Sequence, residues 1–189
     1  MLGKYKKIRD SGLKLLSAKD LSLVLGLDLP SARVAATRLF QKGVLRRLRK
    51  DLYMLSELPL DSFDIANRLL GPSYISFESA LNFWGITTQI PFPITSASMR
   101  SKRYTIEQVE FVYCQLPEKL FNFGYQQEKN FYIATPEKAL LDTLYYSVLG
   151  RKSAPWDEWK LNKINRTLLK KYSAFYPLAI RRMLNTIFP

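Results

Sequence analysis

The hydrophobic positions near the start of the chain recur at helical spacing three times and then form two short runs. Helices are predicted over residues 3–10, 17–25 and 31–42. The two short runs, residues 44–48 and 52–55, are predicted to pair as a β-hairpin. Three helices followed by a hairpin is the order of a winged helix-turn-helix, so residues 1–56 are predicted to form such a domain.

Capping residues define the ends of the second and third helices. Ser17 and Asp20 form a capping-box pattern, and Ser31 is the predicted N-cap of the third helix. Gly26 and Gly43 are suited to the left-handed position that ends a helix. One face of the third helix is expected to pack inward: Ala32, Ala35, Ala36, Leu39 and Phe40.

The pattern after residue 56 mixes helices and strands. Helices are predicted over 61–70, capped by Asp61, and over 77–84, capped by Ser76. Thr135 and Pro136 are predicted to begin a buried helix that ends before Gly150. Short aromatic or β-branched runs predict a small, largely antiparallel sheet: 94–99, 104–106, 109–115, 121–126 and 131–134.

Two further helices are predicted at the C-terminal end, over 156–172 and 177–188. The predicted fold class is therefore α+β. The expected organisation is a winged helix-turn-helix domain at residues 1–56, followed by a mixed domain at residues 57–189 with a small sheet and basic C-terminal helices.

Composition narrows the possible chemistry. The 189 residues include one cysteine, Cys114, and no histidine, so an internal disulfide, the usual zinc sites and a Ser-His-Asp triad are impossible. No glycine-rich phosphate loop, membrane-span pattern or leader pattern is present. We expect a cytoplasmic, non-enzymatic protein without metal or cofactor.

The net charge of +13 is unevenly distributed. Residues 1–56 hold 13 Lys/Arg and 4 Asp/Glu, residues 57–150 hold 7 and 10, and residues 151–189 hold 9 and 2. Two basic ends around a slightly acidic middle indicate one or two surfaces that face a polyanion. Nucleic acid is the favoured partner, because the first segment lacks the bulky apolar helix face that a membrane surface would require.

The outward face of the third helix and the hairpin carry the predicted DNA contacts. Arginine reads guanine, glutamine reads adenine, and a small apolar side chain contacts the thymine methyl group. Four cations within five hairpin residues suit phosphates. The predicted DNA-binding residues are Ser31, Arg33, Val34, Thr37, Arg38, Gln41, Arg46, Arg47, Arg49 and Lys50.

A second basic surface is predicted near the C-terminus, on the helix expected over 156–172. Its role is either a supporting contact to DNA, a contact to another partner, or plain solvation of the helix. The residues are Lys160, Lys163, Arg166, Lys170 and Lys171.

Two other classes of function were weighed. A carboxylate–lysine nuclease site could be built from Asp64, Glu78, Glu110 and Lys138, but their spacing matches no motif. A winged helix could also be a protein-interaction module, in which case binding should depend little on salt.

Three stretches resemble the AbiEi antitoxins of type IV toxin-antitoxin systems. They are Asp51-Leu-Tyr53-Met54 at the end of the winged helix, Pro72-Ser-Tyr-Ile-Ser-Phe-Glu-Ser-Ala-Leu-Asn-Phe-Trp-Gly85, and Ala134-Thr-Pro-Glu-Lys-Ala-Leu-Leu-Asp142. The middle stretch is the most specific. Together the three stretches span most of residues 15–145.

The resemblance implies a regulator of an abortive-infection system, active in phage defence. Its N-terminal domain would bind inverted repeats in its own promoter and repress the operon. The rest of the chain would counter an AbiEii-like nucleotidyltransferase toxin without forming a stable complex. The second basic surface would then be a candidate for toxin neutralisation.

The same motif residues also have a purely structural explanation. Ser76, Ser79 and Thr135 could make caps or local backbone bonds, and Glu137 could interact with a helix dipole. The aromatic and leucine positions Tyr74, Phe77, Trp84 and Leu140 could belong to a core. If exposed, the charged residues Glu78, Lys138 and Asp142 could meet a partner.

Overall fold

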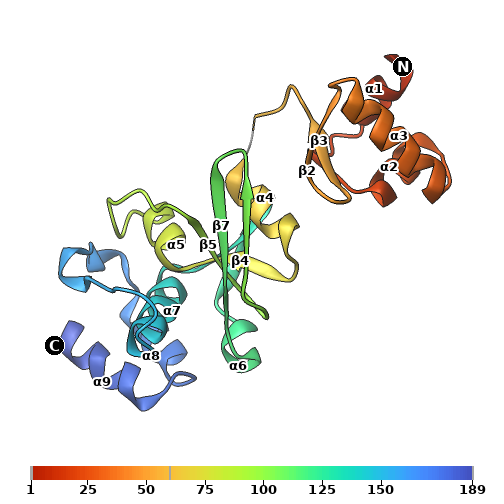
Figure 1. The fold of residues 1–189 in the computed structure, drawn as a ribbon. Helices are drawn as coiled ribbons and strands as arrows, with labels where there is room; N and C mark the ends of the chain where they lie inside the picture. Colours follow the sequence, from red (N-terminus) through yellow and green to blue (C-terminus); the bar gives the residue numbers. More distant parts are fainter. Residues whose placement is uncertain (1, 60, 189) are drawn as a thin grey trace. The chain divides into compact units, whose positions relative to one another are not determined.

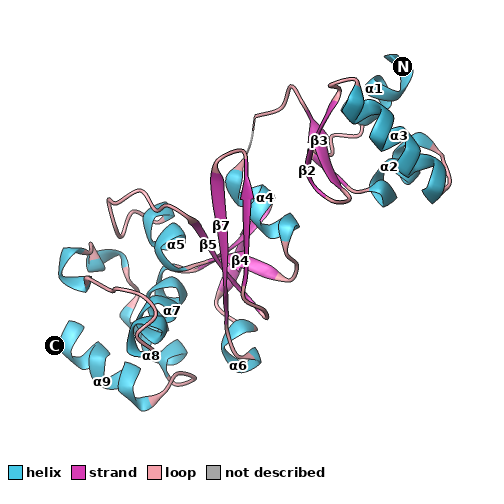
Figure 2. Cartoon of the chain, viewed as in Figure 1, coloured by secondary structure: helices cyan, strands magenta, loops and turns pink. Residues whose placement is uncertain are grey.

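The computed structural model describes residues 2–59 and 61–188, which are drawn in Figures 1 and 2. The chain divides into two compact units, with the boundary between Asp61 and Ser62. Helices and sheets occur in both units, so the fold is α+β, as predicted. Within the described residues, no helix has both the length and the apolar character needed to cross a bilayer.

The N-terminal unit contains three helices and a three-stranded antiparallel sheet in the order β1-β3-β2. The three predicted helices and the hairpin are present, whereas the two-residue strand β1 was not predicted, because two residues show no alternation. The elements are α1 (Leu2–Asp10), β1 (Leu15–Leu16), α2 (Ala18–Leu25), α3 (Leu29–Gln41), β2 (Leu45–Arg49) and β3 (Leu52–Leu55). Their apolar faces enclose one core that includes Ile8, Leu21, Ala36 and Leu55.

The predicted limits of α2 are confirmed. The Ser17 hydroxyl accepts a hydrogen bond from the Asp20 N–H at 3.2 Å, and the Ser17 N–H donates to the Asp20 carboxylate at 2.7 Å. Gly26 follows the helix with φ +66°, in the left-handed region. Both ends of α2 therefore satisfy backbone groups that the helix leaves open.

The C-terminal unit is built on a six-stranded sheet in the order β6-β7-β5-β4-β9-β8. Of its pairings, β5 with β7 and β4 with β9 are parallel and the other three are antiparallel, so the sheet is more mixed than the sequence pattern predicts. The strands are β4 (Ser73–Ile75), β5 (Ile94–Ser98), β6 (Lys102–Ile106), β7 (Val109–Gln115), β8 (Tyr125–Glu128) and β9 (Phe131–Ala134).

Two strands differ from the prediction. The central strand β4 has only three residues between a Gly-Pro turn and α5, which is too short to show a period. The strand expected over 121–126 is wrong, because residues Glu118–Phe121 form the short helix α6 and β8 begins only at Tyr125. Gly124, with φ +73°, separates these two elements.

Helices cover both faces of this sheet (Figure 1). On one face, the Tyr113 hydroxyl of β7 donates to the Ala66 carbonyl of α4 (Ser62–Leu69). On the other face, the Thr95 N–H of β5 donates at 2.8 Å to the Ser79 hydroxyl of α5 (Phe77–Phe83). The helix α7 (Pro136–Val148) packs beside α5, and Thr135 caps it as predicted.

A buried ion pair lies at the centre of the C-terminal unit. Lys138 and Asp142 of α7 have no exposed side-chain surface, and the Lys138 ammonium donates to the Asp142 carboxylate. The Tyr176 hydroxyl accepts from Lys138 at 2.9 Å and donates to Asp142 at 2.6 Å. The Ser76 hydroxyl donates to the second Asp142 oxygen at 2.7 Å. This four-residue group is called the Lys138 network below.

Three aromatic rings complete the surroundings of Lys138. Its nitrogen lies 5.2–5.6 Å from the ring centroids of Phe123, Tyr74 and Tyr176, within the range of cation–π attraction. Burial lowers the pKa of Lys138, and the charge of Asp142 opposes that shift. Burial and Asp142 both raise the pKa of Tyr176.

The buried contacts of the C-terminal unit correct three predictions made from the motifs. Lys138 and Asp142 are not surface residues and cannot meet a partner directly. Ser76 stands at the N-cap position of α5 but makes no side-chain cap, because its hydroxyl is committed to Asp142. Ser79 likewise bonds across to Thr95 and not to its local backbone.

The single helix predicted over 156–172 is also wrong. The segment forms two 3-10 turns, η1 (Trp156–Glu158) and η2 (Leu161–Lys163), and then α8 (Arg166–Ser173). The Lys160 N–H donates to the Ile86 carbonyl at 2.8 Å, and Asn165 caps α8 by accepting from the Leu168 N–H at 3.1 Å. These tertiary and capping bonds interrupt the helical pattern. The last helix, α9 (Leu178–Ile187), agrees with the prediction.

Changing Lys138 to Met should strongly destabilise the C-terminal unit, because the Asp142 charge would stay buried without its cation. Breaking a buried pair on one side typically costs about 3–5 kcal/mol, whereas replacing both partners is often nearly neutral. We therefore expect Lys138→Met to lower the free energy of unfolding by about that amount, and the double change Lys138→Met with Asp142→Leu to lower it much less.

Urea unfolding followed by tryptophan fluorescence measures this effect selectively, because Trp84, Trp156 and Trp159 all lie in the C-terminal unit. Lys119→Met, at an exposed position on α6, is the matched control and should leave the transition in place. Equal transitions for Lys138→Met and the control would contradict the role given to the ion pair.

Candidate nucleic-acid interface

The third helix of the N-terminal unit begins earlier than its sequence indicates. Asp28 is the N-cap of α3, with its carboxylate accepting from the Ser31 N–H at 3.0 Å, and Pro30 lies in the first turn. Hydrogen bonds from the side chain and backbone of Ser31 lower the pKa of Asp28. The prediction of Ser31 as N-cap is therefore wrong, because the carboxylate three residues upstream takes that position.

The two faces of α3 separate as predicted, with one exception. Ala32, Ala35, Ala36 and Leu39 are buried, whereas Phe40, which was expected to pack, is 44% exposed. Small alanine side chains let the helix axis approach the core closely, which leaves the opposite face prominent. That exposed face carries the predicted reading residues Ser31, Arg33, Val34, Thr37, Arg38 and Gln41.

A shallow depression of about 390 Å³ lies beside the N-terminal half of this exposed face. Ser31, Val34 and Arg38 line it together with Lys4 of α1. Lys4 is not among the predicted DNA-binding residues, because nothing in the sequence places the first helix near the third. Tertiary packing brings Lys4 to the same depression as Arg38.

A bulge in β2 arranges the cations of the hairpin. The register with β3 shifts between Arg47 and Arg49, so Leu45 and Leu48, three positions apart, are both buried. In a regular strand the side chains would alternate, and Leu45 and Leu48 would lie on opposite faces. The bulge allows Leu48 to be buried, and Arg47, Arg49 and the turn residue Lys50 are exposed.

The Arg46 side chain makes hydrogen bonds within the N-terminal unit. Its guanidinium donates to the Leu58 carbonyl at 2.6 Å and lies 3.6 Å from the Met54 sulfur. Of the four predicted wing cations, Arg47, Arg49 and Lys50 therefore project into solvent, whereas Arg46 fastens the segment that follows β3.

The turn of the hairpin is fastened to α2. Asp51 has φ +61°, a left-handed conformation that Asp tolerates better than most residues. Its carboxylate accepts a hydrogen bond at 2.9 Å from the Ala18 N–H, which is one of the open donors at the N-terminus of α2. Asp51 therefore fixes the position of the basic hairpin relative to the helices.

The residues of the predicted second basic surface do not lie on one helix, contrary to the prediction. Lys160 and Lys163 belong to the turns before α8, and the Lys163 ammonium donates to the Trp84 carbonyl at 3.0 Å. Arg166, Lys170 and Lys171 lie on α8. The reason is the break in the helix at Asn165 described above.

Three of the four nuclease candidates each pair with a different neighbour. Glu78 pairs with Lys152, Glu110 with Arg103, and Lys138 with Asp142. Among the described residues, Asp64, Glu78 and Glu110 do not belong to any group of three that could hold a metal ion. Cys114 is buried, and burial raises the pKa of its thiol to about 11.

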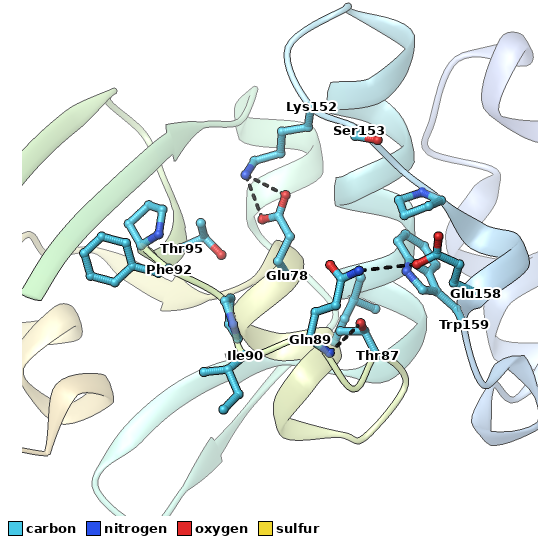
Figure 3. Close-up of a pocket in the computed structure, with 14 residues that line it drawn as sticks. Glu78, Thr87, Gln89, Ile90, Phe92, Thr95, Lys152, Ser153, Glu158 and Trp159 are labelled. Carbon is cyan, nitrogen blue, oxygen red and sulfur yellow. Dashed lines mark hydrogen bonds and ion pairs between the residues drawn. The ribbon is translucent and has the colours of Figure 1, made fainter.

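A pocket of about 580 Å³ in the C-terminal unit was not anticipated (Figure 3). It lies between α5, the loop before β5 and the segment after α7. Lys152 reaches down to Glu78 and donates to both carboxylate oxygens at 2.8 and 2.7 Å, while Phe92 and Trp159 stand on opposite sides. The ammonium has three donors, and this pairing uses two of them.

Replacing Asp51 separates two contributions to the position of the hairpin. Asp51→Gly removes the hydrogen bond to Ala18, but glycine adopts φ +61° without strain. The free energy of unfolding of the N-terminal unit should therefore fall by about 1 kcal/mol. Asp51→Ala should lose about 1–2 kcal/mol more, because alanine is strained in the left-handed region.

Hydrogen exchange measured by mass spectrometry over α2 and the hairpin would report these losses. Asp10→Ala, at an exposed position at the end of α1, serves as the control. Protection unchanged in both Asp51 variants would mean that the turn does not depend on this contact.

Comparison with known proteins identifies no family for the chain, since neither a protein-family model nor a curated protein matches it.

Proposed function

We propose that the N-terminal unit binds duplex DNA, with α3 in the major groove and the β2–β3 hairpin against the flanking phosphates. The observation that carries the proposal is the exposed face of α3, where Arg33, Arg38 and Gln41 stand together beside a basic hairpin. The major groove admits an α-helix, and these side chains match the hydrogen-bonding edges of guanine and adenine.

The uncharged members of this face suit the same role. Val34 is 50% exposed and could contact a thymine methyl group. The Thr37 hydroxyl donates to the Arg33 carbonyl at 3.1 Å, which leaves its oxygen able to accept from a base amino group. Arg47, Arg49, Lys50 and Lys4 supply the phosphate contacts that position the reader.

We further propose that this DNA binding serves transcriptional regulation in an AbiEi-like antitoxin. The support is the resemblance of the three motif stretches. Ser76, Lys138 and Asp142 are buried, so these motif residues have a structural role. The surface that would neutralise the toxin must consist of exposed residues. Rescue of growth in cells that express an adjacent nucleotidyltransferase-like toxin is the direct test of this role.

A protein-interaction role for the same surface is the alternative. The observation in support of this alternative is the exposure of three apolar side chains on α2 and α3: Leu23, Val34 and Phe40. The two functions differ in salt dependence, because phosphate contacts release counterions and an apolar interface does not.

The exposed hairpin cations should contribute to binding of any duplex sequence. Changing Arg47, Arg49 and Lys50 to alanine in the full chain should weaken binding to a random duplex and reduce the salt slope of log K by about 3, because three phosphate contacts are lost. Arg46→Ala alone should have little effect on that slope, because its guanidinium is engaged with Leu58.

A control variant with equal charge loss changes Arg100, Lys102 and Lys119, all exposed in the C-terminal unit. Fluorescence anisotropy across a series of salt concentrations makes the comparison. If the control and the hairpin variant lose the same affinity and slope, the hairpin is not the phosphate contact.

Arg38 should carry sequence preference. The test uses two duplexes, one selected from a random pool by its binding to the intact chain and one of random sequence. Arg38→Ala should weaken binding to the selected duplex by about 1–3 kcal/mol more than binding to the random duplex, because a bidentate contact to guanine is removed. Lys42→Ala, at the exposed end of the same helix, should affect both duplexes alike. If Arg38→Ala weakens binding to both duplexes equally, Arg38 contacts a phosphate and not a base.

A further inference from the structure

The last two helices enclose a groove that the sequence pattern did not reveal. α8 and α9 form its walls, and its volume is about 350 Å³. Leu169 of α8 and Leu184 of α9 are almost fully buried and form the apolar floor, and Phe188 also lines the groove. The groove lies entirely within the C-terminal unit.

The charge around this groove has one sign. Arg166 and Lys170 on α8 and Arg181 on α9 line it, and the described residues of its lining include no aspartate or glutamate. The imbalance extends along the chain, because residues 159–189 contain seven lysines and arginines and no acidic residue. An apolar floor with cationic walls is complementary to an apolar surface edged by carboxylates.

We propose that the α8–α9 groove binds an acidic amphipathic helix of a partner protein. Apolar side chains spaced three and four residues apart would enter between α8 and α9 and cover Leu169, Leu184 and Phe188. Carboxylates on either side of that apolar stripe would meet Lys170 on one wall and Arg181 on the other. The depression is small, so one or two apolar side chains of the partner fill it.

The apolar floor favours a protein partner over nucleic acid. Phosphates need cations but gain nothing from buried leucines. Bases bind by stacking on exposed aromatic faces, and the one ring at this groove, Phe188, already has the Arg166 guanidinium 5.3 Å from its centroid. The site is also formed by different residues from the proposed DNA interface, so the two inferences stand independently.

A fluorescein-labelled helical peptide with leucines at i, i+3, i+4 and i+7 and glutamates elsewhere is the probe. We expect it to bind the full chain, and we expect Lys170→Glu with Arg181→Glu to weaken binding about tenfold or more. The matched control is Lys171→Glu with Arg182→Glu. These residues are exposed neighbours on the same two helices that do not line the groove, and the change in net charge is identical.

Fluorescence anisotropy distinguishes the outcomes. A clear loss in the lining pair with little change in the control pair, and no binding of a second peptide with serine in place of leucine, supports the proposal. Three results would overturn it: no binding of the leucine peptide to the intact chain, equal losses in the two variant pairs, or equal binding of the serine peptide. Duplex DNA that binds the groove in place of the peptide, with affinity lowered by the lining pair alone, would assign the groove to nucleic acid instead.

Discussion

The ammonium group of Lys138 is enclosed by protein, and a buried charge must be compensated by the groups around it. Asp142 supplies the opposite charge from one turn further along α7, and the hydroxyl groups of Ser76 and Tyr176 complete the hydrogen bonds. Because these partners come from α7, from the start of α5 and from the segment before α9, one charge fixes three separate parts of the C-terminal unit.

The buried Lys138 side chain also restricts which residues can occupy the neighbouring positions that only pack against it. A Cβ atom at Gly124 would lie 2.9 Å from the Lys138 side chain, so glycine is required there for space as well as for its positive φ. Phe123 and Tyr176 both face the ammonium, and Tyr176 lies directly before α9. The position of the α8–α9 groove therefore follows indirectly from the Lys138 network.

Polar contacts between charged side chains and backbone groups also hold parts of the N-terminal unit together. Asp51 closes an open N–H of α2, and Arg46 donates to the carbonyl of Leu58 after the hairpin. These two charged side chains serve the fold, which leaves Arg47, Arg49 and Lys50 as the outward cations of the hairpin. The two basic ends of the chain thus differ in kind. Near the N-terminus the cations stand on an exposed helix face and a hairpin, whereas near the C-terminus three of them, Arg166, Lys170 and Arg181, line an apolar groove.

The sequence by itself determined the elements that depend on local chemistry. The capping box of Ser17, the cap of Thr135, the helical spacing of the alanines in α3 and the strand pattern of β7 all act within a few residues. The helices α2 and α7 and the strand β7 formed where they were predicted, and α3 differs at its start, where Asp28 and not Ser31 is the N-cap. The outward position of Arg33, Arg38 and Gln41 follows from that same helical period.

Tertiary structure decided what depends on distant residues. The strand β4 exists because β5 and β9 pair with its two edges, and the segment predicted as one helix over 156–172 is interrupted where the Lys160 N–H donates to the Ile86 carbonyl. Residue spacing could not predict that Lys138 and Asp142 are buried, that the Ser76 hydroxyl donates to Asp142, or that Arg46 donates to the Leu58 carbonyl. Each of these features depends on residues that lie further along the chain than one helical turn. A side chain's type shows which bonds it can make, but only the packing of the chain decides whether its partner is water or protein.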